Sequence, residues 1–357
     1  MSEKRRYLQF ESPFSAAVRG EKLPGVEAGE ILVDAECSAV SAGTELLLFR
    51  GEAPEGIALD ETLPSLEGEL SYPLRYGYAF VGRVSKIGAG VDHALLGRRV
   101  FLFHPHATHA VVPAHTATLI SEELPPERAV FLPNLETAVN LLLDGAPLIG
   151  EEVVVFGLGV VGTLTTILLS RMLRGGVIGV EPQEYRRSLA MSLVPDARCV
   201  PPEELVLPRM SRPSGEYAAM QRRYPGFDLV YELSGRPETL NQAVECAGFG
   251  GRVVVGSWYG RKSAPINLGG RYHRARLKLI SSQVSTVGAE HSGRWSPNRR
   301  LNTALRLLHD LPLERLVTHQ VAFQDAPEAY ERLAAGEPGL MQLIFRYTGG
   351  NHVHLGS

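Results

Sequence analysis

Three glycines, Gly157, Gly159 and Gly162, have the spacing of a loop that binds a dinucleotide pyrophosphate. They follow one apolar run and open a second, as expected where a strand turns into a helix. The first glycine permits the tight turn, the second lets the backbone approach the phosphates, and the third allows the helix to pack closely on the strand. We therefore expect the N–H groups around Val160 and Val161, at the positive end of the helix dipole, to hold the phosphates.

The next apolar run ends in Glu181, about 20 residues beyond the glycines, where a carboxylate can bind the adenosine ribose. Arg186 follows, and a guanidinium there can bind the 2′-phosphate of NADP. Because the Glu181 carboxylate would repel that phosphate, we predict NAD and keep NADP as the alternative. Ser234 and Gly235 follow another strand-like run and are further candidates, since ligands bind at the carboxyl ends of parallel strands.

These candidates require a sheet of parallel strands. From residue 150 onward, strand-like apolar runs alternate with runs of helical spacing. The predicted strands are 152–156, 177–180, 227–232, 252–256 and 277–281, and the predicted helices are 160–173, 185–193 and one that opens at Pro237. This succession predicts an α/β fold with a doubly wound parallel sheet.

Two regions flank this sheet. Before residue 120, short β-type runs separated by turn residues predict a mostly antiparallel, barrel-like domain. Its predicted strands are 30–35, 80–87, 99–103 and 110–112, and the C-terminal region is predicted to contain a helix at 301–308, an amphipathic segment at 326–333 and a strand at 341–347. We place the domains at 1–145, 146–290 and 291–357, with a flexible tail from about residue 349.

The composition excludes several classes of protein. Charged residues make up 21% of the 357 residues, hydrophobic residues 44%, and the net charge is −3, which gives no indication of a nucleic-acid partner. No apolar stretch reaches membrane-spanning length, and no secretory apolar core follows the basic N-terminus. Cys37, Cys199 and Cys246 lie far apart, so we expect reduced thiols and a cytoplasmic protein.

Four segments give the chain a resemblance to a known superfamily. These are residues 41–46, 77–82, the glycine loop and 316–319. They resemble the medium-chain dehydrogenases/reductases, the relatives of zinc-type alcohol dehydrogenase. The resemblance implies a GroES-like β-barrel catalytic domain, a Rossmann NAD(P)-binding domain, a small-molecule substrate, and a homodimer or homotetramer paired near residues 278–283.

Within this superfamily, one branch shares additional short sequence motifs with the chain. Residues 41–47, 103–106, 282–284 and 293–295 are similar to the branch that includes bacteriochlorophyllide hydroxyethyl dehydrogenase.

The chain departs from the zinc-dependent members at the metal ligands. Ser41 or Ala42 stands where those members have a cysteine, and Tyr78 replaces their histidine. The third ligand position falls within residues 133–136, where Glu136 has the one metal-binding side chain. A catalytic zinc needs three good ligands and an open position, and a structural zinc of this type needs four clustered cysteines. We therefore expect a zinc-independent member without a metal site.

Without zinc, the substrate oxygen needs another hydrogen-bond or proton donor. Thr44 matches the hydroxyl that begins the proton relay in relatives, and Tyr78 occupies a former ligand position. His104 and His106 lie in a stretch that lines the substrate pocket of relatives, and imidazole suits proton transfer near neutral pH. Each has a structural alternative: local hydrogen bonding for Thr44, packing for Tyr78 and an exposed turn for the histidines.

These predictions describe a zinc-independent, NAD(P)-dependent oxidoreductase that interconverts a secondary alcohol and a carbonyl compound. Reduction of the C=C bond of an enone is a second hypothesis, because hydrogen bonds alone can stabilise an enolate. A non-catalytic NAD(P)-sensing protein is a third, since an inactive descendant would also lose its metal ligands.

Overall fold

The computed structural model describes residues 4–60, 62–173, 176–194, 196–208 and 215–347. Contacts divide the chain into two compact units, one made of residues 1–131 and 313–357 and the other of residues 132–312. These limits differ from the expected ones at 145 and 290, because helices α3 (Leu132–Gly145) and α8 (Pro297–Asp310) pack on each other in the second unit. The tail from about residue 349 lies outside the described residues. In the described part of the chain, no helix is long and apolar enough to cross a membrane.

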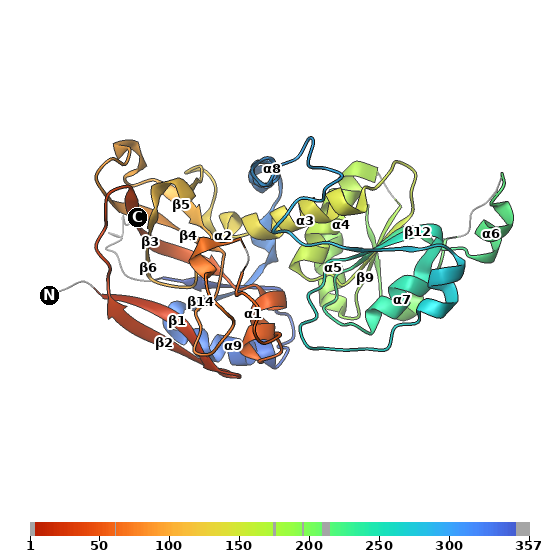
Figure 1. Ribbon diagram of the computed structural model, residues 1–357, viewed down its shortest axis with the longest axis horizontal. Coiled ribbons are helices and arrows are strands. Elements are labelled where there is room, and N and C mark those ends of the chain that lie inside the picture. Colours follow the sequence, from red (N-terminus) through yellow and green to blue (C-terminus); the bar gives the residue numbers. More distant parts are fainter. Residues whose placement is uncertain (1–3, 61, 174–175, 195, 209–214, 348–357) are drawn as a thin grey trace. The chain divides into compact units, whose positions relative to one another are not determined.

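The first unit is built on a mostly antiparallel sheet with the strand order β14-β15-β3-β4-β5-β7, in which β6 also pairs with β3 (Figure 1). Its strands are β1 (Lys4–Ser12), β2 (Ser15–Lys22), β3 (Glu30–Ala39), β4 (Phe80–Ile87), β5 (Arg99–Leu102), β6 (His109–Pro113), β7 (Thr118–Leu119), β14 (Val317–Ala322) and β15 (Gln342–Arg346). Its helices are α1 (Ala42–Phe49), α2 (Pro126–Ala129) and α9 (Ala326–Ala334). This architecture confirms the predicted antiparallel β domain.

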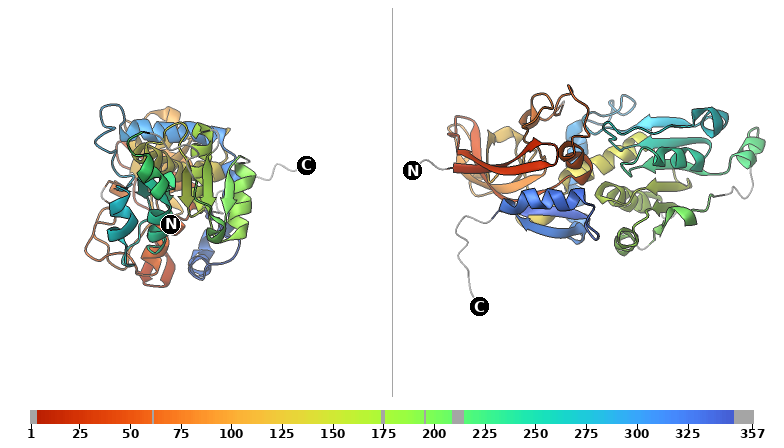
Figure 2. Two further views of the ribbon diagram at one scale, coloured as in Figure 1. Left: turned by 90° about the vertical axis from the view of Figure 1, so that its right-hand side faces the viewer. Right: turned by 90° about the horizontal axis from the view of Figure 1, so that it is seen from below.

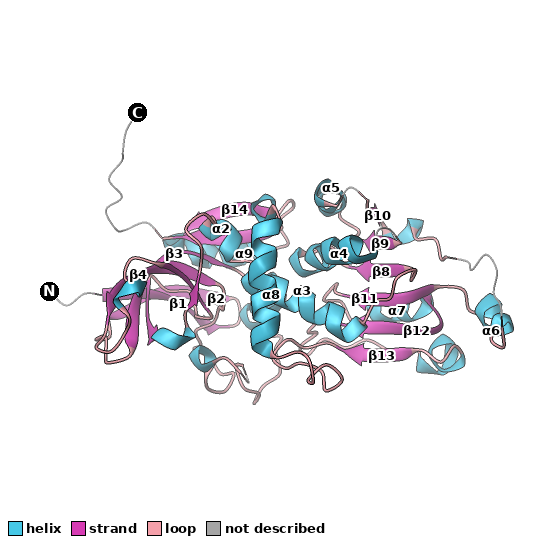
Figure 3. Cartoon of the chain, turned by 90° about the horizontal axis from the view of Figure 1, so that it is seen from above, coloured by secondary structure: helices cyan, strands magenta, loops and turns pink. Residues whose placement is uncertain are grey.

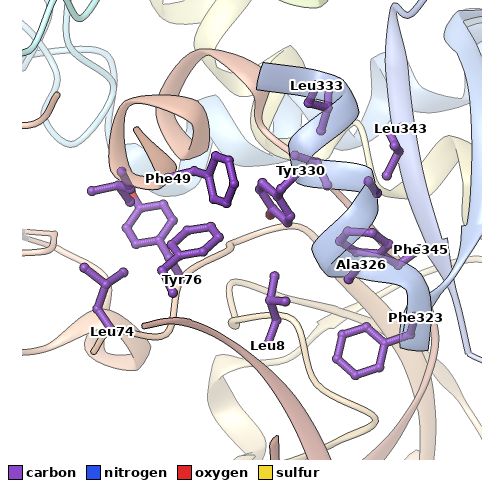
Figure 4. Packing of buried hydrophobic residues seen from close by; sticks show 14 of the residues in the cluster. Leu8, Phe49, Leu74, Tyr76, Phe323, Ala326, Tyr330, Leu333, Leu343 and Phe345 are labelled. Carbon is purple, nitrogen blue, oxygen red and sulfur yellow. The ribbon is translucent and has the colours of Figure 1, made fainter. Parts of the chain in front are cut away.

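The β1–β2 hairpin of this unit was not predicted. It forms a separate two-stranded sheet, and α9 packs beside β2, as the right-hand view in Figure 2 shows. Between them lies an apolar core to which Leu8, Phe49, Tyr330 and Phe345 contribute buried side chains (Figure 4). The core therefore joins the two ends of the chain through side chains that are far apart in sequence.

The second unit is a parallel sheet with the strand order β10-β9-β8-β11-β12-β13 (Figure 3). Its strands are β8 (Val153–Phe156), β9 (Val177–Val180), β10 (Arg198–Val200), β11 (Phe227–Glu232), β12 (Ala247–Val255) and β13 (Lys278–Ser281). Besides α3 and α8, its helices are α4 (Val160–Leu173), α5 (Glu184–Leu193), α6 (Ala218–Arg223) and α7 (Thr239–Cys246). The predicted doubly wound sheet is confirmed, although β12 begins earlier and α7 later than expected.

Helices cover this sheet on two faces, because successive side chains of a strand point to opposite sides. Val153 and Val155 of β8 belong to a buried cluster with Leu141 of α3 and Leu169 of α4. The intervening side chains of β8 belong to a second buried cluster, which includes Val244 of α7. Burial on both faces explains why the strands read as continuous apolar runs.

Candidate functional site

The carboxyl ends of the parallel strands meet along one edge of the second unit's sheet. Pairing places Phe156 of β8 opposite Val180 of β9 on one side and Glu232 of β11 on the other, and Glu232 opposite Val255 of β12. From β8 the chain passes to β9 and β10 and then returns to β11 on the opposite side. Open α/β sheets bind their ligands at such a reversal. The glycine loop begins immediately beyond Phe156.

The three glycines of this loop differ in their surroundings. Gly157 has a φ of 90°, and a Cβ atom there would lie 2.7 Å from the carbonyl oxygen of Leu233. A Cβ at Gly162 would lie 1.8 Å from the carbonyl oxygen of Gly157, so a side chain would push α4 away from the loop. A Cβ at Gly159 would meet no atom within 4 Å. Since α4 begins at Val160, this open space lies at a helix N-terminus and fits a pyrophosphate.

Glu181 follows β9 and contacts the same loop. Its Oε2 atom accepts a hydrogen bond from Leu158 N at 3.0 Å, and its Oε1 atom accepts one from Gln183 N at 3.0 Å. The side chain is buried. Arg186 lies on α5, where its guanidinium partly offsets the rise that burial causes in the pKa of Tyr185. The structure thus brings the carboxylate expected at the ribose against the loop expected at the pyrophosphate.

A second buried carboxylate at this edge, Glu232, was not predicted as a site residue. Its Oε1 atom accepts a hydrogen bond from Ser234 N at 2.9 Å, and the hydroxyls of Ser234 and Tyr259 also donate to the carboxylate. Burial and the hydrogen bond to Glu232 raise the pKa of Tyr259. Gly235 N donates to Ser257 Oγ at 2.9 Å. The predicted cofactor residues Ser234 and Gly235 are therefore held in place, and the acidic residue ending an apolar strand was the available signal.

In the first unit, three hydroxyl groups gather at the N-terminus of α1. The Tyr78 hydroxyl donates to Ser41 Oγ, and Ser41 immediately precedes the helix. Thr44 lies in the first turn, where its N–H donates to the Ser41 carbonyl oxygen at 3.1 Å. Burial raises the pKa of Tyr78, and hydrogen bonds with Ser41 and Thr44 oppose this rise in part. Tyr78 is therefore protonated at neutral pH and is a hydrogen-bond donor.

The two predicted histidines lie in different environments. His106 is fully buried, with its Nε2 atom 3.0 Å from Glu45 Oε2 and its Nδ1 atom 2.6 Å from Ser38 Oγ. Both ring nitrogens of His106 are therefore occupied by protein groups. His104 is half-buried, and its Nδ1–H donates to the Pro105 carbonyl oxygen at 2.7 Å. Burial lowers the pKa of His104 to about 4, so this ring is neutral at neutral pH.

Glu45, which entered the sequence argument only as part of a matched motif, is also fully buried. Its Oε1 atom accepts a hydrogen bond from Ser41 N at 2.7 Å. Its Oε2 atom accepts one from the Tyr330 hydroxyl on α9 and contacts His106. His106 and Tyr330 come from distant parts of the chain, so no local pattern indicated these two partners.

The chain has sequence relatives among threonine dehydrogenases. It is 26% identical to an L-threonine 3-dehydrogenase of Pyrococcus abyssi over 382 aligned residues, which cover 97% of this chain and 100% of the relative. It is 23% identical over 300 residues to that of Xanthomonas euvesicatoria pv. vesicatoria, covering 76% of this chain and 82% of the relative. No protein-family model matches the chain.

Solved dehydrogenase structures share the fold. An alcohol dehydrogenase of Escherichia coli CFT073 in complex with NADH has a TM-score of 0.72 at 20% identity and covers 97% of this chain and 100% of its own. The 2R,3R-butanediol dehydrogenase of Bacillus subtilis has a TM-score of 0.73 at 18% identity, with 96% and 99% covered. The chain is a medium-chain dehydrogenase/reductase. It is an NAD(P)-dependent dehydrogenase with the antiparallel β domain and the parallel Rossmann sheet of this superfamily.

At the positions that the sequence comparison matched to zinc ligands, the side chains have protein partners. Tyr78 is a protonated phenol whose hydroxyl donates to Ser41. Glu136 Oε1 accepts a hydrogen bond from Arg300 Nε at 3.1 Å, and burial raises the pKa of Glu136. Among the described residues, no group of three or more His, Cys, Asp or Glu side chains is placed to hold a metal ion. The matched positions thus hold the hydroxyls of Ser41 and Tyr78 and the carboxylate of Glu136, which is paired with Arg300.

Proposed function

We propose that this medium-chain dehydrogenase interconverts a secondary alcohol and its carbonyl compound without zinc, with Tyr78 and Thr44 at the substrate oxygen. The observation that supports this is the protonated Tyr78 hydroxyl at a former ligand position, hydrogen-bonded to Ser41. When substrate binds, the Tyr78 O–H would turn from Ser41 Oγ to the carbonyl oxygen, where a neutral phenol can donate and stabilise the negative charge that develops. When bound, the nicotinamide supplies or accepts the hydride.

The proton path then follows from the hydroxyl cluster. In the reducing direction, the carbonyl carbon receives hydride and the oxygen takes the Tyr78 proton, which leaves an alcohol and a phenolate. The hydroxyls of Ser41 and Thr44 stabilise that phenolate until a proton from water restores it. In the oxidising direction the Tyr78 phenol first loses its proton to water, and the phenolate, stabilised by Ser41 and Thr44, then accepts the alcohol proton. Of the two histidines, the neutral ring of His104 remains the candidate for proton exchange with this cluster.

We infer that NAD binds at the carboxyl edge of the Rossmann sheet. The open space at Gly159 and the N–H groups of Val160 and Val161 support a pyrophosphate site there. Glu181, held against the loop, would accept hydrogen bonds from the adenosine ribose and repel a 2′-phosphate, so NAD is preferred to NADP despite Arg186. Steady-state kinetics with both cofactors test this, and a clear preference for NADP would contradict the role of Glu181.

The catalytic proposal is tested by Tyr78→Phe, which removes the hydroxyl and keeps the ring. We expect kcat for ketone reduction to fall by roughly 10²–10⁴-fold, the usual contribution of a positioned acid. NADH affinity should not change, because the proposed cofactor residues belong to the other unit. Tyr76→Phe is the matched control, since Tyr76 is a neighbouring buried tyrosine whose ring centroid lies 6.1 Å from that of Tyr78. Full activity of Tyr78→Phe would reject the proposal.

Metal content provides an independent test of zinc independence. Chelator-washed protein should retain its activity and contain no stoichiometric zinc. Activity that is lost on chelation and restored by zinc would show that a metal performs the role proposed for Tyr78.

A substrate panel separates the alternatives. It should contain secondary alcohols such as L-threonine, hydroxyethyl-substituted aromatic compounds and enones. Turnover of the alcohols supports the proposal, and preference for the hydroxyethyl compounds would support the branch related to bacteriochlorophyllide hydroxyethyl dehydrogenase. Turnover of enones alone would favour a C=C reductase, and cofactor binding without any hydride transfer would favour an NAD(P)-sensing protein.

We also propose that two copies pair through β13 to form a homodimer, or a homotetramer built from such pairs. β13 is the outermost strand beside β12, and an edge strand presents unpaired backbone groups to a second chain. Multi-angle light scattering tests this, and a monomer at assay concentrations would contradict it.

A further inference from the structure

A closed polar network surrounds Glu45 and His106 in the first unit. Both side chains are 0% exposed, and Glu45 Oε2 lies 3.0 Å from His106 Nε2. Ser38 Oγ lies 2.6 Å from His106 Nδ1 and 2.7 Å from the Tyr347 hydroxyl. On the other side of the pair, Glu45 accepts a hydrogen bond from the Tyr330 hydroxyl. The pair is therefore satisfied entirely by protein groups.

The walls around this network are aromatic. The His106 ring meets Phe345 edge-on, with ring centroids 5.1 Å apart. The Tyr330 ring lies 5.0 Å from Phe10 and 5.5 Å from Phe49, and Figure 4 shows Tyr330 between Phe49 and Phe345. Polar and charged groups are costly to bury in such a core, and apolar residues of similar volume often replace buried ion pairs without loss of stability. Stability alone therefore does not account for the pair, and its contacts outside the core point to another role.

Two such contacts lead to Tyr78. Glu45 Oε1 accepts a hydrogen bond from Ser41 N at 2.7 Å, and Ser41 Oγ accepts the hydrogen of the Tyr78 hydroxyl. The His106 ring lies against Gly77, where a Cβ atom would be 2.8 Å from Cδ2 and 2.9 Å from Nε2 of the ring. Gly77 has a φ of 124° and immediately precedes Tyr78. Glu45 thus fixes the acceptor of the Tyr78 hydrogen bond, and His106 packs against the backbone that carries the donor.

We propose that Glu45 and His106 are positioning residues that hold the Tyr78 and Ser41 hydroxyls in the geometry for proton transfer. This inference rests on the proposed role of Tyr78. It adds that the hydroxyl pair depends on a buried carboxylate and imidazole, which themselves do not touch the substrate.

The charge of Glu45 has a second, measurable consequence. Burial raises the pKa of Tyr78 most, and the negative charges of Glu45 and Asp60 raise it further. Other titratable groups near the pair are Tyr76, Tyr330 and Tyr347, which burial keeps protonated, and His104, which burial keeps neutral. Removing the Glu45 charge should therefore make Tyr78 more acidic, whereas removing a merely structural contact should not.

The test is Glu45→Gln, which preserves volume and removes the charge. The ionisation of Tyr78 is followed by ultraviolet difference titration of each protein against its Tyr78→Phe counterpart, without substrate or cofactor. We expect the Tyr78 transition to move to lower pH by about one unit, a typical effect of one nearby buried charge. The kcat should fall roughly tenfold to hundredfold, as when a reacting group is misplaced, with NADH affinity unchanged.

Glu36→Gln is the matched control, because Glu36 lies in the same unit and pairs with Arg83 and Arg99 instead. It should leave both the Tyr78 transition and kcat unchanged. His106→Gln can still donate to Glu45 and should keep most of the activity, whereas His106→Leu should lose it. If Glu45→Gln does not fold, the comparison of these two variants tests the positioning role. A Tyr78 transition and a kcat that are unchanged in folded Glu45→Gln, or equal activity of the two His106 variants, would overturn the inference. Full activity of Tyr78→Phe would instead remove the proposed function itself.

Discussion

Replacement of Gly159 by alanine should separate cofactor binding from stability. A Cβ at this position meets no atom within 4 Å, and Gly159 is not among the residues with positive φ. The added methyl group therefore introduces neither a clash nor backbone strain. At compatible positions, alanine in place of glycine stabilises a protein by about 0.4–1 kcal/mol, because it restricts the unfolded chain. We expect the Tm of Gly159→Ala without cofactor to equal or exceed that of the wild type.

The same methyl group would occupy the space that a pyrophosphate needs. A hydrogen bond between a charged phosphate and a backbone N–H contributes about 1.5–3 kcal/mol. Loss of one such bond corresponds to a rise in the NADH dissociation constant of roughly 10- to 100-fold. Fluorescence titration with NADH measures this affinity, and thermal unfolding of the same samples measures stability.

Gly162→Ala is the opposite case and serves as the comparison. Its Cβ would lie 1.8 Å from the carbonyl oxygen of Gly157, so the backbone must shift. We expect a loss of about 1–3 kcal/mol in the free energy of unfolding, as in other overpacked interiors. If Gly159→Ala bound NADH as tightly as the wild type, the assignment of the pyrophosphate to this loop would be refuted.

Two further predictions concern stability. Arg300 is buried and donates to Glu136 Oε1 at 3.1 Å and to Asn140 Oδ1 at 2.7 Å. Arg300→Leu would leave the Glu136 carboxylate unpaired, so we expect the free energy of unfolding, measured with urea, to fall by about 3–5 kcal/mol. A loss below about 1 kcal/mol would contradict this reasoning. His104 has a pKa of about 4 in the folded protein and about 6.5 when unfolded, so the unfolded chain binds the extra proton between these values. The free energy of unfolding should therefore decrease by about 2 kcal/mol as pH falls from 6.5 to 4, with an allowance for the part of the ring that water reaches. His104→Gln should remove this component, and identical pH dependence of the two proteins would disprove it.

The Rossmann sheet could be predicted because its signals are local. Strands buried on both faces give unbroken apolar runs, so β9 and β11 have the predicted bounds. Helix α4 also has its predicted bounds, because the glycines mark its start. The α8 helix begins at Pro297, earlier than expected. The sequence contained a signal for this start, a serine followed by a proline, that the prediction did not use. Ser296 caps the helix, since its Oγ accepts a hydrogen bond from Arg299 N at 3.2 Å.

The first unit was less predictable because its structure depends on distant contacts. The strands of the β1–β2 hairpin are charged and partly exposed, so neither gives a clear apolar alternation. Helix α1 lies in a segment that could be matched to a family motif, yet its apolar residues gave no helical prediction. Its place is determined by packing against α9, from the opposite end of the sequence.

Three buried carboxylates also depend on contacts that the sequence does not reveal. Glu45 accepts a hydrogen bond from Ser41 N, Glu181 from Leu158 N and Glu232 from Ser234 N. Each one holds the backbone of a segment that the sequence had marked as functional, but only Glu181 was itself predicted as a site residue. Motif spacing identifies groups that meet ligands, whereas the groups that hold them are defined by contacts across the fold.

A carboxylate held against a backbone N–H makes its segment rigid in the absence of ligand. A buried carboxylate that accepts a backbone N–H fixes a loop before any ligand arrives, so less conformational entropy is lost on binding. The cost of desolvating the charge is met at folding rather than at each turnover. Glu45 and Glu232 also accept tyrosine hydroxyls, from Tyr330 and Tyr259, which ties each loop to a second segment of its own unit. Under the proposed function, hydroxyls held by a buried carboxylate would organise the substrate oxygen in this chain, a role that the metal has in the zinc-dependent members.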